Sequence, residues 1–210
     1  MILTVGNIKG GVGKTNTAVH LAAVFARLGP TLLVDGDAMN GSLMWSQRGD
    51  GKGLPFTVVD DRSQAKALRD GKFAHVIFDT EANPEPDDIK HYATGCDLLI
   101  VPGVPESAAS DGLFLTLNLL QALGVTHYRV LLNRVRHNRR KEADDLRAAL
   151  QTMNVPTFQT EIPDFAAFDK ANAKGVPVFA VQDERAARAW EAFEAVGKEI
   201  VHAEALVQHG

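Results

Sequence analysis

Residues 9–15 constrain the fold of this chain more than any other segment, because they place three glycines between a strand-like run and a helix-like run. The segment reads Lys9-Gly10-Gly11-Val12-Gly13-Lys14-Thr15 and follows the β-favouring stretch Ile2–Asn7. Glycine lets the backbone curl so that successive N–H groups point inward, at the start of a helix whose dipole also favours negative charge. The segment therefore predicts a loop that binds the phosphates of a nucleotide.

The side chains at the end of this loop suit a nucleotide and its metal ion. Lys14 directly follows the glycines, where its ammonium group reaches the β- and γ-phosphates. The Thr15 hydroxyl takes one coordination position on Mg²⁺. We therefore predict ATP and Mg²⁺ as cofactors, and the residues expected to bind the nucleotide here are Gly10, Gly11, Val12, Gly13, Lys14, Thr15 and Asn16.

Strand-like and helix-like segments alternate from the loop to the end of the chain. The first helical pattern covers residues 14–28, and Gly29-Pro30 ends it. We expect strands at residues 2–7, 31–35, 56–60, 74–79, 97–102, 129–133 and 156–162, and helices at 14–28, 107–123, 138–152 and 184–206. This alternation predicts an α/β fold with a mostly parallel sheet and helices on both of its faces.

Composition limits the size and class of the protein. A chain of 210 residues, with 45 % hydrophobic and 23 % charged residues, is long enough for a single domain over residues 1–210 with a substantial core. No apolar run reaches the roughly 18 residues that span a bilayer. The N-terminus has no charged region of the kind that opens a secretory signal, so we expect a cytoplasmic protein. The single Cys96 excludes an internal disulfide framework.

Acidic residues end two of the predicted strands. Asp35 and Asp37 follow the strand at residues 31–35, and Asp79 ends the strand at residues 74–79. Ligands of an open parallel sheet lie beyond the carboxyl ends of its strands, so these carboxylates are expected beside the glycine-rich loop. Nucleotide hydrolysis needs acidic groups near the γ-phosphate and the metal ion, which makes both strand ends candidates for that chemistry.

The loop departs from the common G-x-x-x-x-G-K-[ST] pattern in a specific way. Ile8 stands where the first glycine would be, and an additional lysine, Lys9, opens the loop. In these residues the chain resembles the ParA/MinD ATPases, whose deviant Walker A motif reads Lys-Gly-Gly-Val-Gly-Lys-Thr. The resemblance implies a P-loop NTPase fold of the deviant Walker A class. It also implies a homodimer in the ATP state, in which Lys9 crosses the interface to the nucleotide of the partner subunit.

The resemblance implies roles for the acidic residues as well. Asp37 would orient the attacking water, Asp79 would hold Mg²⁺ directly or through water, and Asp35 would support the loop or the water shell of the metal. The candidate catalytic residues are therefore Lys9, Lys14 and Asp37, and the candidate metal ligands are Thr15, Asp37 and Asp79.

Two further segments resemble the base-contacting parts of the family. Asn133, which ends the strand at residues 129–133, matches the position from which family members contact adenine. Pro163 and Asp164 match a second base-contacting loop. The chain departs from the family after its acidic segments, at Ala38-Met39 and Glu81-Ala82, and at Asn16, which is usually threonine; these departures leave the hydrolysis rate open.

The resemblance covers nearly the whole chain and is closest to a short ParA, since only eight residues precede Lys9 and leave no room there for a helix-turn-helix domain. The tail of residues 203–210 is not basic, so no membrane binding of the MinD kind is expected. Nonspecific double-stranded DNA would have to bind a local basic patch, because the formal net charge is −4. The candidate DNA-binding residues are Arg136, Arg139, Arg140, Lys141, Lys170, Lys174, Arg185 and Arg188.

Three functions remain open at this point. The first is a partitioning ATPase, associated with the nucleoid, that segregates plasmid or chromosome copies with a ParB-type centromere-binding partner. The second is a ParA-like ATPase that positions a protein cargo, such as a chemoreceptor cluster or a microcompartment. The third is a metabolic enzyme similar to dethiobiotin synthetase, which phosphorylates a small substrate; Lys9 and the short glycine loop favour the dimeric ATPases over it.

Overall fold

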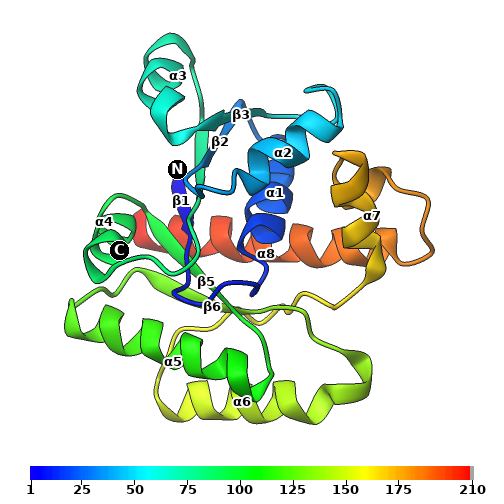
Figure 1. The fold of residues 1–210 in the computed structure, drawn as a ribbon. Helices are drawn as coiled ribbons and strands as arrows, with labels where there is room; N and C mark the ends of the chain where they lie inside the picture. Colours follow the sequence, from blue (N-terminus) through cyan, green and yellow to red (C-terminus); the bar gives the residue numbers. More distant parts are fainter. Residues whose placement is uncertain (209–210) are drawn as a thin grey trace.

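A parallel sheet (Figure 1) brings the glycine-rich loop and the acidic strand ends together, because all of them follow the carboxyl ends of its strands. The computed structural model describes residues 1–208, and six strands form the sheet within that part of the chain. They are β1 (Ile2–Val5), β2 (Thr31–Asp35), β3 (Thr57–Asp60), β4 (His75–Asp79), β5 (Leu98–Gly103) and β6 (Tyr128–Leu132), in the spatial order β3-β2-β4-β1-β5-β6. The predicted parallel sheet is confirmed, and β1 lies at its centre between β4 and β5.

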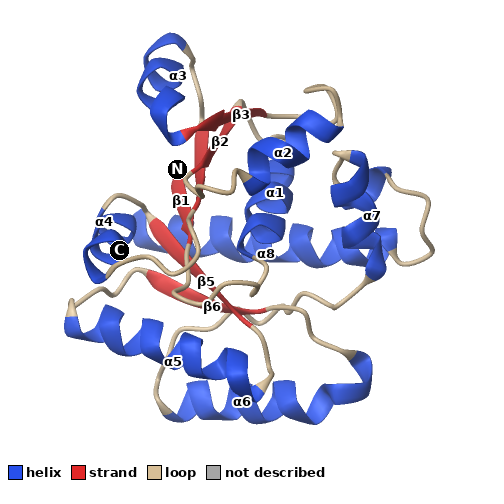
Figure 2. Cartoon of the chain, viewed as in Figure 1, coloured by secondary structure: helices blue, strands red, loops and turns tan. Residues whose placement is uncertain are grey.

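Helices cover both faces of this sheet, as Figure 2 shows. They are α1 (Lys14–Phe25), α2 (Gly41–Arg48), α3 (Gln64–Asp70), α4 (Pro86–Thr94), α5 (Ser107–Ala122), α6 (Arg140–Thr152), α7 (Ala166–Lys174) and α8 (Ala186–Gln208), with short 3₁₀ turns at Asp61–Ser63, His137–Arg139 and Val178–Ala180. Within residues 1–208, no helix is both long enough and apolar enough to cross a membrane. Of the tail considered above, His209 and Gly210 lie outside the described residues.

Alternating side chains of the strands divide the interior into two layers. Leu3, Ile77 and Ile100 point to one face, where they pack with residues of α1, α2, α7 and α8. Leu99 and Val130 point to the other face and pack with residues of α4, α5 and α6. Burial on both faces explains why the strand sequences are almost continuously apolar rather than alternating, which is typical of a parallel sheet.

The long C-terminal helix bears out its sequence pattern. Trp190, Phe193 and Ile200 are expected on one apolar side, and all three are buried against the α1 side of the sheet. Gly197 of α8 lies close to α1, because a Cβ atom there would stand 2.6 Å from Cγ1 of Val24. The α8 helix therefore packs against α1, the helix that begins at the glycine-rich loop, and forms much of the layer on that face of the sheet.

Several predicted boundaries are wrong. The first helix ends at Phe25 rather than Leu28, whose side chain is 62 % exposed. The predicted strand at residues 156–162 is not a regular strand: a single isolated bridge pairs Thr157 with Val130, although Phe158 and Ile162 also donate backbone hydrogen bonds to β6. This segment follows the sheet edge irregularly because the N–H groups of Gln159 and Thr160 donate to the Glu199 carboxylate of α8 rather than to β6.

Helices α2, α3, α4 and α7 are additional to the predicted ones. They have seven to nine residues, which gives an apolar repeat few positions in which to show itself. One of them carries a readable start signal: Glu85 and Asp88 form a capping box around Pro86 at the beginning of α4.

Helix α2 and the loop after it contact the residues that directly follow α7. The indole nitrogen of Trp45 donates to the Val176 carbonyl at 3.2 Å. Gly53, in the loop after α2, lies so near α7 that a Cβ atom there would stand 2.2 Å from the Gly175 carbonyl. The segment after the acidic end of β2 is thereby joined to the helix that precedes α8.

Candidate nucleotide site

The glycine-rich loop takes a conformation that glycine favours at two points. Gly11 and Gly13 have backbone φ angles of +76° and +89°, in the left-handed region that other residues rarely adopt. Gly13 directly precedes α1, and its carbonyl accepts a hydrogen bond from the Thr17 N–H at 2.9 Å. The first N–H groups of a helix have no partner within the helix, so the loop has the geometry of the predicted phosphate cradle.

Asn7 holds the loop from inside, a role that the sequence pattern does not reveal. Its side chain is fully buried and donates to the Pro102 carbonyl of β5 at 2.7 Å. Its side-chain oxygen accepts from the Lys9 N–H at 2.8 Å and from the Thr116 hydroxyl of α5 at 3.1 Å. A buried amide with both ends paired fixes the entry of the loop relative to β5 and α5.

Lys14 lies beneath the loop. Its ammonium group donates to the carbonyls of Asn7 and Lys9, both at 3.2 Å, and the residue is only 6 % exposed. Burial lowers the pKa of the Lys14 ammonium, and the negative charges of Asp79 and Asp37 partly offset this effect. A lysine held here by two carbonyls can exchange them for phosphate oxygens at little cost in position.

The pairing of the strands brings the predicted acidic residues together. Asp35 of β2 is in register with Asp79 of β4, and Asp79 is also in register with Val5, the last residue of β1 before the loop. Asp79 is buried, and burial raises the pKa of its carboxyl group to about 7. The site thus concentrates carboxylates next to Lys14, as the predicted chemistry requires.

The surroundings of Asp79 fit a magnesium ion. Its Oδ2 atom accepts from the Ser42 hydroxyl of α2 at 2.8 Å, while its Oδ1 atom is buried without a hydrogen-bond partner among the described residues. Thr15 is close by, since its side chain partly offsets the raised pKa of Asp79, and its hydroxyl oxygen would stand 3.1 Å from a Cβ atom on Gly41, the neighbour of Ser42. Carboxylate and hydroxyl oxygens are ligands that Mg²⁺ prefers, so Asp79 and Thr15 could hold the ion and Ser42 could orient the carboxylate.

Asp35 shapes the segment between β2 and α2. Its two oxygen atoms accept from the Asp37 N–H at 3.1 Å and from the Leu43 N–H at 2.8 Å. These contacts agree with the loop-supporting role expected of Asp35. The Asp37 carboxylate is half-buried and accepts from the Met39 N–H at 2.9 Å. Its part in orienting water stays a prediction.

The residues predicted to contact the base meet in one cavity of about 210 Å³. Asn133, Pro163 and Asp164 line it together with Gly13 and Asn16 of the phosphate loop region. Trp45 of α2 and the α7 residues Phe168, Asp169 and Asn172 line its other side, together with Arg134 and Phe165. The side-chain oxygen of Asn16 is buried without a partner among the described residues, which leaves an acceptor at this cavity.

Asn133 is engaged with the loop itself. Its amide nitrogen donates to the Val12 carbonyl at 2.9 Å and to the Thr17 hydroxyl at 3.3 Å, and the residue is fully buried. A Cβ atom on Gly13 would stand 2.4 Å from that nitrogen, so the third loop glycine is needed for this close approach. Asn133 therefore supports the loop, and its contact with adenine stays a prediction.

The candidate DNA-binding arginines near α6 are largely paired with acids. Arg136 contacts Asp164 at 2.9 Å and Glu106 at 3.2 Å, and Arg139 contacts Glu142 at 3.6 Å. Arg140 pairs with Asp144 at 3.1 Å and also with Glu161. Exposed ion pairs of this kind contribute little to stability, but each carboxylate cancels much of the positive field by which its arginine would attract DNA.

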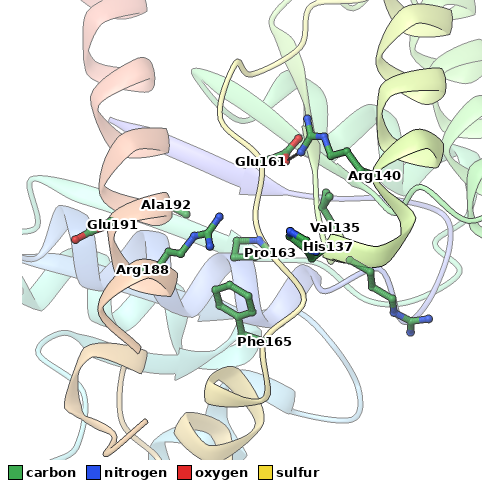
Figure 3. A pocket seen from close by; sticks show the side chains of 10 residues that line it. Val135, His137, Arg140, Glu161, Pro163, Phe165, Arg188, Glu191 and Ala192 are labelled. Atoms are coloured by element: carbon green, nitrogen blue, oxygen red, sulfur yellow. Dashed lines mark hydrogen bonds and ion pairs between the residues drawn. The ribbon is translucent and has the colours of Figure 1, made fainter. Parts of the chain in front are cut away.

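Arginines from α6 and α8 share a second cavity, of about 370 Å³, next to the base-contacting loop (Figure 3). Figure 3 shows Arg140 beside Glu161 and Arg188 extending from α8 toward Pro163. Lys170 pairs with Asp183 at 2.7 Å, and Arg185 lies 3.8 Å from Glu184. Among the described residues, Lys141, Lys174 and Arg188 form no ion pair. The predicted basic cluster is therefore only partly free to attract phosphate.

One known protein family matches most of this chain. The family described as the CobQ/CobB/MinD/ParA nucleotide binding domain matches residues 3–178. The chain belongs to this family. That assignment confirms the resemblance based on the loop residues, together with the predicted P-loop fold and a nucleotide-binding site.

Among family members, the chain is similar to proteins named for carboxysome distribution. It is 29 % identical over 202 residues to the maintenance of carboxysome distribution protein A of Gloeobacter kilaueensis, covering 95 % of this chain and 93 % of that protein. The protein of the same name from Halothiobacillus neapolitanus is 24 % identical over 187 residues, with 84 % and 86 % covered.

Solved structures of the family share the fold. The MinC:MinD cell division complex of Aquifex aeolicus superposes with a TM-score of 0.76 at 15 % identity, covering 96 % of both chains. A McdA–ATP complex from Cyanothece superposes with a TM-score of 0.72 at 16 % identity, covering 95 % of both chains.

Proposed function

We propose that this chain, acting as a single P-loop ATPase domain over residues 1–210, is an ATP-dependent dimeric switch that positions a protein cargo. The observation that carries this proposal is the similarity to carboxysome distribution proteins along nearly the whole chain. This similarity favours the cargo-positioning alternative over plasmid or chromosome segregation. The partitioning function stays the second candidate, since both share the loop, the acidic strand ends and the basic residues.

The loop and strand ends support binding of ATP with Mg²⁺. The loop glycines offer N–H groups to the phosphates, and Lys14 offers its ammonium group. Thr15 and Asp79 would hold Mg²⁺, which neutralises charge on the β- and γ-phosphates. Among the described residues, the Oδ1 atom of Asp79 is buried without a hydrogen-bond partner, which supports this assignment because an isolated buried carboxylate oxygen otherwise carries a desolvation cost.

Hydrolysis would then depend on Asp37, which follows Asp35 on a segment held to α2. Asp35 accepts hydrogen bonds from both ends of that segment, so it sets where the Asp37 backbone lies. Asp37 would orient the attacking water, and Lys9 would reach the nucleotide of the partner subunit from an exposed position at the start of the loop. Nucleotide state would thereby control whether two subunits stay together.

We propose that the ATP-bound protein binds DNA while it positions its cargo. A dimer would make twice as many phosphate contacts as a monomer. Lys141, Lys174 and Arg188 form no ion pair within the part of the chain that the structure describes, so they are freer to make such contacts than the arginines that carboxylates neutralise. DNA binding should be measured with ATP, with ADP and without nucleotide across a salt series. We expect tight binding with ATP only; equal binding under all three conditions would exclude a nucleotide-driven switch.

The partner distinguishes the candidates. Purified Asp37→Ala protein, loaded with ATP, should retain a cargo or cargo-adaptor protein on an affinity column, and wild-type protein with ADP should not. Recovery of a centromere-binding protein of the ParB type would instead support partitioning. Release of ADP that requires a small substrate and no partner would support an enzyme of the dethiobiotin synthetase type.

A further inference from the structure

Lys9 lies against a glycine of α5. The aliphatic stem of Lys9 runs over Gly112, a buried residue early in this helix. A Cβ atom at position 112 would stand 2.5 Å from Cβ of Lys9, 3.1 Å from its Cγ and 3.3 Å from its Cδ. Non-bonded carbon atoms pack best at about 3.5–4.0 Å, and 2.5 Å is a clash, so glycine is required here for the observed path of Lys9.

The backbone on both sides of this contact is fixed by hydrogen bonds. Thr116, one turn after Gly112, accepts from the Ile8 N–H at 3.2 Å and donates to Asn7 at 3.1 Å. The Lys9 N–H donates to the same Asn7 side chain at 2.8 Å. The helix and the first residues of the loop are therefore tied together, and neither can withdraw from the other without loss of these bonds.

We propose that Gly112 is a positioning residue that seats Lys9, so that the lysine leaves the loop toward the partner subunit. The consequence for the partner's nucleotide rests on the proposed dimeric function, whereas the seating itself concerns a single subunit. A helix interior disfavours glycine relative to alanine, so packing of α5 alone would not call for it. The three nearest atoms around its empty Cβ position all belong to Lys9, which identifies the residue that it accommodates.

The first variant to test is Gly112→Ala. A change of rotamer cannot move the Cβ atom of Lys9, so the loop backbone must shift, and with it the Lys9 carbonyl that accepts from Lys14. A displacement of about 1 Å in an active site can cost about 100-fold in rate. We expect ATP hydrolysis to fall between about 10- and 100-fold. Affinity for Mg·ADP, measured by titration calorimetry, should weaken because the loop has moved.

The second variant removes the Cβ atom on the other side of the contact. Lys9→Gly/Gly112→Ala should regain the wild-type affinity for Mg·ADP, although it should not dimerise with ATP because it lacks the amine. Gly197→Ala is the matched control: it also places a methyl group in a tight helix contact, against Val24, and should leave affinity for Mg·ADP unchanged. Should Gly112→Ala fail to fold, recovery of folding in the double variant is the expected result.

The outcomes separate the seating from the proposed function. Wild-type hydrolysis and nucleotide affinity in Gly112→Ala would overturn the seating. Failure of Lys9→Gly/Gly112→Ala to restore the affinity for Mg·ADP, or folding, would also overturn the seating. The effect of substituting Gly112 would then not depend on the side chain of Lys9. Full ATP-dependent dimerisation of Lys9→Ala would overturn the cross-subunit role of this lysine, while the affinity measurements would still decide the seating.

Discussion

The amide nitrogen of Asn133 lies 2.9 Å from the carbonyl oxygen of Val12, so the end of β6 holds the glycine-rich loop in place. The same nitrogen reaches the Thr17 hydroxyl of α1 at 3.3 Å. One buried side chain thus connects an outer strand, the loop and the helix that follows it. Its position explains why Gly13 has no space for a side chain.

Replacing Asn133 with alanine should loosen the loop. The substitution leaves the Val12 carbonyl and the Thr17 hydroxyl without this partner in a buried place, at a cost of about 1–3 kcal/mol of stability. Affinity for Mg·ADP should fall along with the midpoint of urea unfolding. An unchanged affinity would show that the loop keeps its form without the amide.

Asp37→Ala should separate binding from hydrolysis. Among the described residues, the Asp37 carboxylate accepts a hydrogen bond only from the Met39 N–H, and an alanine keeps the backbone bonds of this position, so the substitution should spare nucleotide binding. Loss of the group that orients the attacking water should lower the hydrolysis rate by about 100-fold. Phosphate release measured over hours tests this, with Lys14→Ala as a variant that should not bind ATP. Sustained hydrolysis by Asp37→Ala would refute the role of Asp37.

The stability of the protein should depend on pH through His20. This side chain is fully buried on α1: its Nδ1 atom lies 2.8 Å from the Asn16 carbonyl, and its Nε2 atom accepts from the Val178 N–H at 3.0 Å. Burial lowers the pKa of His20 from 6.5 to about 4. Below pH 6.5 His20 is therefore protonated in the unfolded chain but stays neutral in the folded chain. The contribution of His20 to stability is lost as the pH falls toward 4.

A shift of this size corresponds to roughly 3 kcal/mol over that interval. His20→Gln lacks the titrating ring, so its free energy of unfolding should fall less steeply between pH 6.5 and 4.5 than that of the wild type. Urea unfolding at several pH values measures both slopes. Equal slopes would show that His20 does not titrate as the buried geometry implies.

Charge reversal should affect DNA binding most at the unpaired basic residues. Lys141→Glu and Lys174→Glu remove cations that no acid neutralises among the described residues. Arg27→Glu is the control, since Arg27 is paired with Glu194 of α8. Each lost phosphate contact should lower the salt slope of binding by about 0.9. If Arg27→Glu weakened ATP-dependent DNA binding as much as the lysine variants, the proposed surface would be in the wrong place.

The site was predictable where one short motif fixes both backbone and chemistry. Lys9, Lys14, Thr15, Asp35 and Asp79 meet because parallel strands end at one edge, and the loop glycines and strand-terminal acids are visible in the sequence. The packing partners were not predictable in the same way. Asn7 and Ser42 act through contacts with residues distant in the chain, and Gly112 acts through a space that only the folded structure defines.

The charge cluster shows the opposite difficulty. Counting arginines near residues 134–147 predicts a basic patch, but Glu106, Asp164 and Glu161 come from other parts of the chain and neutralise several of them. Such pairings depend on the tertiary fold and cannot be read from local composition. The proposed DNA-binding surface therefore has fewer free cations among the described residues than the sequence indicates.

The mass of the particle in solution tests the central proposal most directly. Light scattering with size-exclusion chromatography should be run on Asp37→Ala protein, in which ATP persists, with ATP and with ADP. We predict the mass of a dimer with ATP and of a monomer with ADP, and a monomer under both conditions once Lys9→Ala is added. The same mass with ATP and with ADP in Asp37→Ala would contradict an ATP-dependent dimeric switch.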